Sequence, residues 1–157
     1  MKLISLSICM LGLALMTGST QADSKNYNAS SCVQFVGDGK ILNFSNIFND
    51  SSTTTMNVDC VATKSTNQLK SAWIEVKDLS STEDISCNLI SHYNGIGQSG
   101  GFIWNQTQKT SGINSNWQVL NYTSLPASDN GHYFLSCSVP KKTSNGASWL
   151  GTYRITE

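Results

Sequence analysis

The chain has 157 residues, of which only 13% are charged, and its ten basic side chains balance ten acidic ones. This length suits one domain with its own hydrophobic core. A net charge near zero makes no case for nucleic acid or an anionic membrane surface as a partner.

The first 22 residues have the pattern of a secretory signal peptide. Lys2 gives a positive start, an apolar run extends from Leu3 to Met16, and small or polar residues lead to Ala22. The apolar run is shorter than the roughly 20 residues that a membrane span needs. We therefore predict cleavage after Ala22 and a single secreted or periplasmic domain over 23–157, with no membrane span in the mature form.

Short runs of alternating apolar and polar residues follow, separated by turn residues such as Asp38-Gly39, Asn94-Gly95 and Asn145-Gly146. Strands are predicted at Ser31–Val36, Lys40–Phe44, Thr54–Thr63, Ser71–Asp78, Asp84–His92, Gly101–Gln106, Asn116–Thr123, His132–Val139 and Trp149–Thr156. Strands of this number and spacing predict an all-β fold, an antiparallel β-sandwich of about eight to nine strands, with a barrel as the alternative.

The mature chain contains four cysteines, Cys32, Cys60, Cys87 and Cys137. An even number behind a signal peptide predicts two disulfides formed in an oxidising compartment. The closest two are 27 residues apart, which does not fit the close ligand pairs of a zinc site, so we predict no metal.

Three pairings of these cysteines are possible, and we favour Cys32–Cys60 with Cys87–Cys137. The third and fourth cysteines lie mid-strand on apolar faces, and Cys32 begins a strand near the free mature end, where a tie to an early strand prevents fraying. The rival pairing, Cys60–Cys137 with Cys32–Cys87, is the one that an immunoglobulin-like core would use.

The stretch DNGHYFLSC, residues 129–137, tests that immunoglobulin comparison. Asp129, Gly131 and Tyr133 stand in the order found there, but the cysteine follows the tyrosine by four residues and not two. The strand SAWIEVKD also places Trp73 with Glu75 and Lys77, opposite its apolar side. We interpret the stretch as sandwich architecture outside that family.

The mature chain resembles a group of small secreted bacterial proteins of unknown function that have four cysteines. The resemblance is carried by SSCVQF, KILN, ISCNLIS, YFLSCSVP and the final GTYRITE. In that group the second cysteine is often followed by proline, whereas Cys60 here precedes Val61. The resemblance implies a disulfide-bonded secreted β domain and implies no catalytic residues.

No catalytic motif or cofactor site is predicted. His92 and His132 stand in no nucleophile motif. Glu83 and Asp84 are the only adjacent acidic pair, and neighbours on a strand point to opposite faces. The glycine-rich stretch 95–101 lacks the lysine and the following helix of a phosphate-binding loop.

Four tryptophans are the remaining signal, because aromatic faces stack on sugar rings and are enriched in binding hot spots. Trp73 and Trp104 are our candidate ligand-binding residues, since Trp73 is expected to be substantially exposed and Trp104 lies next to the glycine-rich stretch. Trp117, which shares a face with Val119, and Trp149, which shares one with Tyr153, are expected in the core.

Three functions remain open. The first is a non-enzymatic secreted module that binds glycan or an extracellular protein. The second is a structural or protective envelope protein without a small ligand, and the third is a small secreted hydrolase. An exposed tryptophan cluster would favour the first, and a uniformly polar surface the second.

Overall fold

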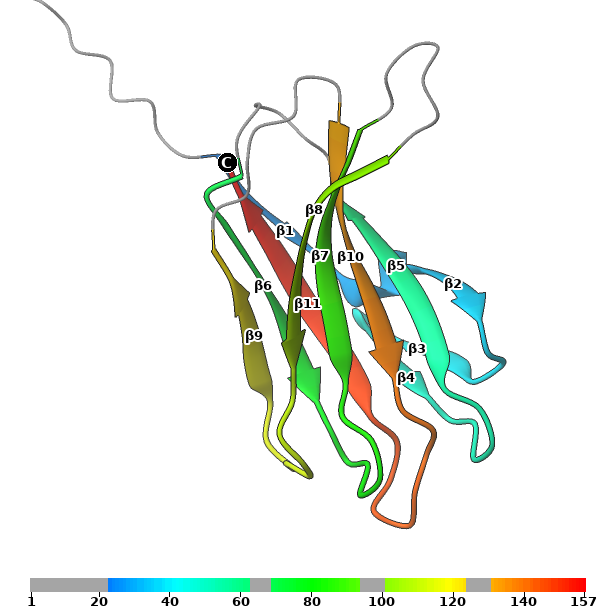
Figure 1. Ribbon diagram of the computed structural model, residues 1–157. Helices are drawn as coiled ribbons and strands as arrows, with labels where there is room; N and C mark the ends of the chain where they lie inside the picture. Colours follow the sequence, from blue (N-terminus) through cyan, green and yellow to red (C-terminus); the bar gives the residue numbers. More distant parts are fainter. Residues whose placement is uncertain (1–22, 63–68, 94–100, 124–130) are drawn as a thin grey trace, which may run out of the picture.

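The computed structural model describes residues 23–62, 69–93, 101–123 and 131–157, so the predicted signal peptide lies outside the described residues. Two layers of β-strands face each other (Figure 1). The strands are β1 (Ser24–Tyr27), β2 (Val33–Val36), β3 (Lys40–Asn43), β4 (Asn46–Asn49), β5 (Met56–Ala62), β6 (Ser71–Lys77), β7 (Ser86–Tyr93), β8 (Gly101–Lys109), β9 (Gln118–Tyr122), β10 (Gly131–Val139) and β11 (Trp149–Thr156). One 3-10 turn, η1 (Ala29–Ser31), lies between β1 and β2.

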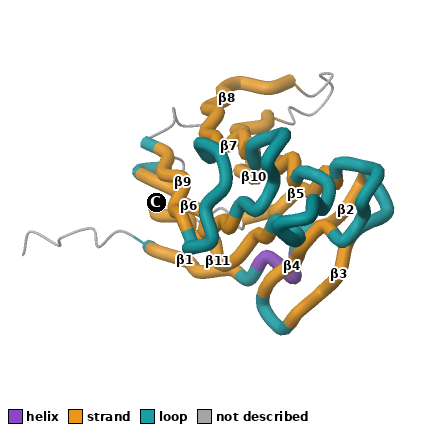
Figure 2. The backbone as a smooth tube through the Cα atoms, turned by 90° about the horizontal axis from the view of Figure 1, so that it is seen from below, coloured by secondary structure: helices purple, strands orange, loops and turns teal. Residues whose placement is uncertain are grey.

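Six strands form one sheet, in the order β3-β4-β11-β6-β9 with β1 paired to β11, and five form the other, in the order β2-β5-β10-β7-β8. Every strand pair is antiparallel. The view along the strands separates the two layers (Figure 2). The predicted antiparallel sandwich is therefore confirmed.

Two strands were not predicted. Ser24–Tyr27 and Asn46–Asn49 have four residues each, and the first is polar at three of its four positions. A strand this short shows too little alternation for recognition, and each is held instead by pairing with the long strand β11. The chain consequently contains eleven strands among the described residues, against the eight or nine expected.

The core lies between the layers and is built by alternation. In β6 the side chains of Ala72, Ile74 and Val76 are buried, while the positions between them are only half-buried. The other sheet contributes the buried side chains of β5, β7 and β10 in the same way. Each strand thus has an inner face that stabilises the fold and an outer face that is available for another purpose.

Both disulfides have the predicted pairing, Cys32–Cys60 and Cys87–Cys137. Cys87 and Cys137 lie directly opposite each other on β7 and β10, and all four cysteines are buried. The chain segments between the paired cysteines span 28 and 50 residues. By loop-closure entropy the two bonds contribute about 3.6 and about 4 kcal/mol to stability.

A buried carboxylate holds the loops at the lower end of Figure 1 together. Asp78 accepts hydrogen bonds from the backbone amides of Ser80 and Ile85, both at 3.0 Å, and from the hydroxyls of Ser148 and Thr110. These donors come from three loops, so one fully buried side chain fixes the loop positions relative to the sheets. Among the described residues, no helix has the length and apolarity to cross a membrane.

Candidate functional site

A row of aromatic side chains crosses the outer face of the six-stranded sheet. Phe48 of β4 and Lys77 of β6 both lie directly opposite Trp149 of β11. Directly opposite residues share a face of an antiparallel sheet. The Phe48 and Trp149 rings are tilted against each other with centroids 4.3 Å apart. Both rings are half-buried, so they form a surface and not part of the core.

Trp149 reaches this face because β11 contains a bulge. The register between β11 and β6 shifts between Leu150 and Tyr153, where one additional residue of β11 has no partner. The alternation is reset there, so Tyr153 is fully buried while Trp149 lies outside. Our expectation that Trp149 and Tyr153 share the core face was therefore wrong.

Trp117 extends the row across β6. It precedes β9, in which Val119 lies opposite Glu75 and Gln118 opposite Val76, so Trp117 comes next to the position of Lys77. The Trp117 side chain is 45% exposed. The prediction that it lies in the core was wrong, because Leu120 and Tyr122 supply the inner face of this strand. We refer to Phe48, Trp149 and Trp117 as the aromatic row.

Gly151 in the bulge makes room for the Trp117 ring. A Cβ atom at this position would lie 3.0 Å from Cζ3 of Trp117, 3.2 Å from Cβ of Glu75 and 3.3 Å from its Oε2. The edge of the indole and the Glu75 carboxylate therefore both lie over the glycine. Any other residue at position 151 would displace one of them.

Two charged side chains lie among these rings without a partner in the part of the chain that the structure describes. Glu75 and Lys77 occupy the same face of β6 and are both half-buried. Within the described part of the chain, neither takes part in a hydrogen bond or an ion pair. A half-buried charge that has no hydrogen-bond or ion-pair partner among these residues is available to a ligand.

Trp73 lies on the same outer face, nearer the other end of β6. The predicted face is confirmed, since its neighbours Ala72 and Ile74 are buried, but the side chain is half-buried and not substantially exposed. The Arg154 guanidinium lies over its ring, 5.3 Å from the centroid, and Arg154 Nε donates a hydrogen bond of 2.5 Å to Asn26 Oδ1. One face of this indole is thereby covered.

Trp104, the other predicted ligand-binding residue, lies on β8 with its backbone opposite Ser91 of β7. Its side chain is outside the described residues, so its role stays a prediction. The aromatic row lies on the other sheet, and the structure does not bring Trp104 and Trp73 together on one face.

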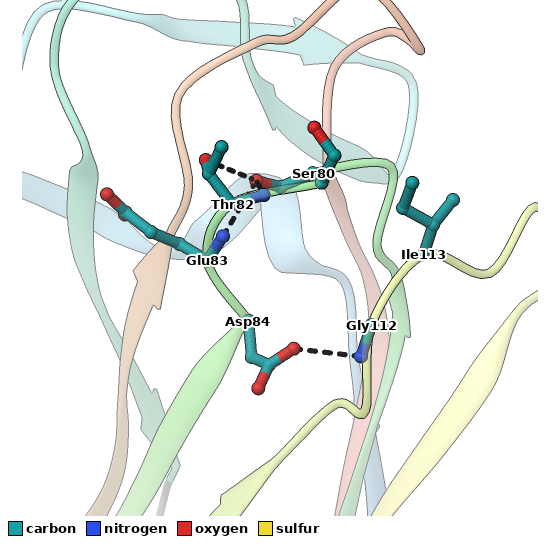
Figure 3. Close-up of a pocket in the computed structure, with 7 residues that line it drawn as sticks. Ser80, Thr82, Glu83, Asp84, Gly112 and Ile113 are labelled. Atoms are coloured by element: carbon teal, nitrogen blue, oxygen red, sulfur yellow. Dashed lines mark hydrogen bonds between the residues drawn. The ribbon is translucent and has the colours of Figure 1, made fainter.

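A hollow of 380 Å³ lies between the β6–β7 and β8–β9 loops (Figure 3). Its polar groups are largely engaged with one another. Ser80 Oγ accepts from the backbone amides of Thr82 and Glu83, at 3.3 and 3.2 Å, and Asp84 accepts from the Gly112 amide at 2.9 Å. Glu83 additionally accepts from the Thr55 hydroxyl at 3.1 Å. These bonds shape two turns.

A second hollow is lined by Asp38, Gly39, Asp50 and Ser51. The hydroxyls of Thr54 and Ser51 lower the pKa of Asp38, and Asp50 forms an ion pair with Lys142 at 2.7 Å. No cluster of three or more histidine, cysteine, aspartate or glutamate side chains suited to a metal occurs among the described residues. The polar groups of the two hollows are thus largely bonded to other groups of the protein, and the aromatic row is the better candidate for a ligand-binding site.

Comparison with known proteins agrees with the architecture. No model of a known protein family and no curated sequence matches the chain. A low-affinity xylan-binding module, CBM86, from the gut symbiont Roseburia intestinalis has the same fold at a TM-score of 0.52 and 17% identity, over 85% of this chain and 94% of that one.

Two larger proteins are similar over a part of their length. A GH26-CBM35 β-(1,4)-mannanase of Podospora anserina has a TM-score of 0.50 and 8% identity, over 84% of this chain and 27% of that one. A family two carbohydrate esterase of Cellvibrio japonicus has a TM-score of 0.47 and 9% identity, over 87% and 34%. The chain thus spans about a third or less of these two proteins. At such identities the likenesses concern the fold alone.

Proposed function

We propose that this protein is a secreted, non-catalytic glycan-binding module, and that the glycan lies on the aromatic row. The observation that carries the proposal is the combination, on one sheet face, of exposed indole surface with two charged groups that have no partner among the described residues. The C–H face of a sugar ring is apolar and packs against an aromatic face, while its hydroxyls need polar partners at the rim.

The dimensions of the row fit an extended ligand. The backbones at Trp149 on β11 and at Trp117 beside β9 are about 10 Å apart, with β6 between them. The Trp117 indole reaches from there across β6 to Gly151, so the rings of the row form a nearly continuous apolar strip. A strip across three strands suits a chain of sugar rings better than one small molecule. Trp117, at the β9 end of the row, is 45% exposed, as suits a polymer that lies along a surface.

The fold supports the same proposal. The xylan-binding module from Roseburia intestinalis matches over nearly its whole length. Two buried disulfides suit a protein that works outside the cytoplasm. Cleavage after Ala22 is part of this proposal, and N-terminal sequencing of the exported form should find Asp23 first. A protein that still begins at Met1 would contradict the signal-peptide prediction.

The envelope-protein alternative expected a uniformly polar surface. The exposed apolar side chains of Trp117, Val119 and, on the other sheet, Phe35 and Val61 argue against it. They favour a protein with at least one contact surface.

Glycan binding by the exported, disulfide-bonded chain tests the proposal. The chain is screened by affinity electrophoresis through gels that contain xylan, mannan or hydroxyethyl cellulose, and then titrated by calorimetry. Trp117→Ala should weaken binding at least tenfold, about 1.4 kcal/mol, as the loss of a central aromatic contact does. The change in unfolding free energy should remain about 1 kcal/mol or less, since the ring is nearly half exposed.

The matched control is Phe35→Ala, which removes a 56% exposed aromatic ring from the other sheet. It should leave glycan binding unchanged. Equal affinity of Trp117→Ala and the unaltered chain, or failure of the unaltered chain to bind any of these polysaccharides, would overturn the proposal.

A further inference from the structure

We propose that Glu75 and Lys77 make the aromatic row selective for uncharged glycans, so that acidic and basic polysaccharides are both disfavoured. This inference rests on the proposed function and deepens it. It concerns two charges of opposite sign, placed two residues apart on one strand face, between indoles that would hold the sugar rings.

The geometry keeps the two charges near the ligand and apart from each other. Glu75 Oε2 lies over Gly151, beside the Trp117 ring. Lys77 lies directly opposite Trp149, with Trp117 on its other side. Their positions are about 7 Å apart along the strand, and no ion pair joins them. Each charge thus faces the ligand surface separately.

The hydrogen-bonding chemistry of Glu75 and Lys77 determines which ligand can bind to both side chains. An ionised carboxylate only accepts hydrogen bonds, and an ammonium group only donates them. A sugar hydroxyl does either, so a neutral glycan can donate to Glu75 and accept from Lys77 at the same time. The carboxylate of a uronic acid is attracted by Lys77 but repelled by Glu75. The ammonium group of an amino sugar is attracted by Glu75 but repelled by Lys77.

Arg154 does not change this balance at the row. Its guanidinium donates to Asn26 and lies over Trp73, farther along the sheet. Glu75 and Lys77 are therefore the charges nearest the aromatic row on β6. The pair predicts that removing one charge opens the site to ligands of that same sign.

The experiment uses three forms of one polymer: hydroxyethyl cellulose, carboxymethyl cellulose and diethylaminoethyl cellulose, with xylan and its carboxymethylated and aminoethylated derivatives as the second set. The unaltered chain should bind the neutral form of a set best. Glu75→Gln should raise affinity for the acidic form about fivefold, and Lys77→Gln should raise affinity for the basic form about fivefold. That factor corresponds to about 1 kcal/mol for one partly screened charge contact.

Three results separate the possibilities. If the unaltered chain binds an acidic or basic form more tightly than the neutral one, or if neither substitution changes the preference, the charge selection is wrong while glycan binding stands. If the unaltered chain binds no polymer in any form, the proposed function falls and this inference with it. Thermal unfolding of both variants checks that they fold, and both should, because the two side chains make no hydrogen bond or ion pair among the described residues.

Discussion

The outer faces of the two sheets have the same construction, but indole side chains lie on only one of them among the described residues. On the six-stranded sheet the outer face carries the aromatic row, Val119 and Trp73. On the five-stranded sheet the outer positions are mostly small and polar: Asn57, Asp59, Ser86, Asn88, Thr107, Ser136 and Ser138. That face also has an apolar row, Val61, Phe134 and Ile90, and exposed apolar side chains on β2, Val33, Phe35 and Val36. It has no indole at an outer position among its described side chains.

The inner faces of the two sheets, by contrast, are alike. Both present buried aliphatic side chains to a common core, as a two-layer sandwich requires. Because the five-stranded sheet forms without an indole on the described part of its outer face, the fold does not demand indoles on the other one. We infer from this difference that the aromatic row is not required for folding. Contact with a ligand is the role that an exposed aromatic surface of this kind commonly has.

The sharpest way to break this division is to substitute neighbours on one strand. Ile74 is fully buried and Glu75 lies on the outer face beside it. Ile74→Ala should lower the free energy of unfolding by about 3 kcal/mol through lost burial and a cavity. Glu75→Ala should change it by less than about 0.5 kcal/mol. Denaturant unfolding of both variants measures this, and equal losses would mean that the two faces are wrongly assigned.

Alkaline pH should lower the stability of the protein through Tyr122, a tyrosine on the inner face of β9. Tyr122 is buried, and its hydroxyl donates to the Cys87 carbonyl at 3.0 Å; burial raises the pKa of this phenol above its usual value near 10. With the folded pKa raised, the unfolded chain ionises first as pH rises. Stability is therefore full below pH 10 and falls above it, by up to about 1.4 kcal/mol per pH unit from this group.

Tyr122→Phe should remove that part of the alkaline loss. The variant is compared with the unaltered chain by urea unfolding at pH 8 and at pH 11, and its deficit at pH 8 should shrink or reverse at pH 11. Tyr133 and Tyr153, whose pKa values are also raised by burial, remain in both proteins and cancel in the comparison. An unchanged deficit at the two pH values would show that Tyr122 ionises as readily in the folded chain as in the unfolded one.

The alternation of residues predicted the sandwich and the long strands, and together with the position of Cys32 near the mature end it favoured the observed disulfide pairing. It placed Cys87 and Cys137 on inner faces, and they lie directly opposite each other. The position of the site was not predictable in this way. In β11 a bulge of one residue resets the alternation between Trp149 and Tyr153, and no local pattern marks it except Gly151.

The error at Trp117 has a different cause. Residues 117 to 122 carry apolar side chains on both faces, so alternation alone leaves the inner face undecided. Polar residues do not decide it either, because Asn121 lies on the face of Trp117 and Val119 while Gln118 lies on the face of Leu120 and Tyr122. The two charged neighbours of Trp73 do decide the face of that strand, and there the predicted face is confirmed.

A glycine substitution tests whether the bulge shapes the aromatic row. Gly151→Ala places a methyl group 3.0 Å from the Trp117 ring and 3.2 Å from the Glu75 side chain, so the contact surface that these two side chains form must shift. We expect glycan affinity to fall about fivefold, or about 1 kcal/mol. The control is Gly112→Ala, where φ is +68° and a Cβ would meet nothing within 4 Å. It should cost stability through backbone strain and leave affinity intact. Equal glycan affinity of Gly151→Ala and the unaltered chain would show that the bulge does not shape the binding site.

The smallest effect is expected at Trp73, and it decides where the site ends along the sheet. Trp73 shares the outer face with the aromatic row, yet the Arg154 guanidinium covers one face of its ring and is itself held by Asn26. A sugar ring could stack there only by displacing that cation. Trp73→Phe should therefore change glycan affinity less than twofold and lower stability by about 0.5 to 1 kcal/mol, the contribution of a partly exposed cation–π contact.

Fluorescence checks the same residue without a ligand. Acrylamide quenching, taken as the difference between the unaltered chain and Trp73→Phe, should report an accessible but partly shielded indole. The corresponding difference for Trp117→Phe should be larger, because that ring is the more exposed. A tenfold loss of affinity in Trp73→Phe would extend the site along β6 past Glu75. Arg154 would then be a ligand contact, because the cation would have to leave the indole when a sugar binds.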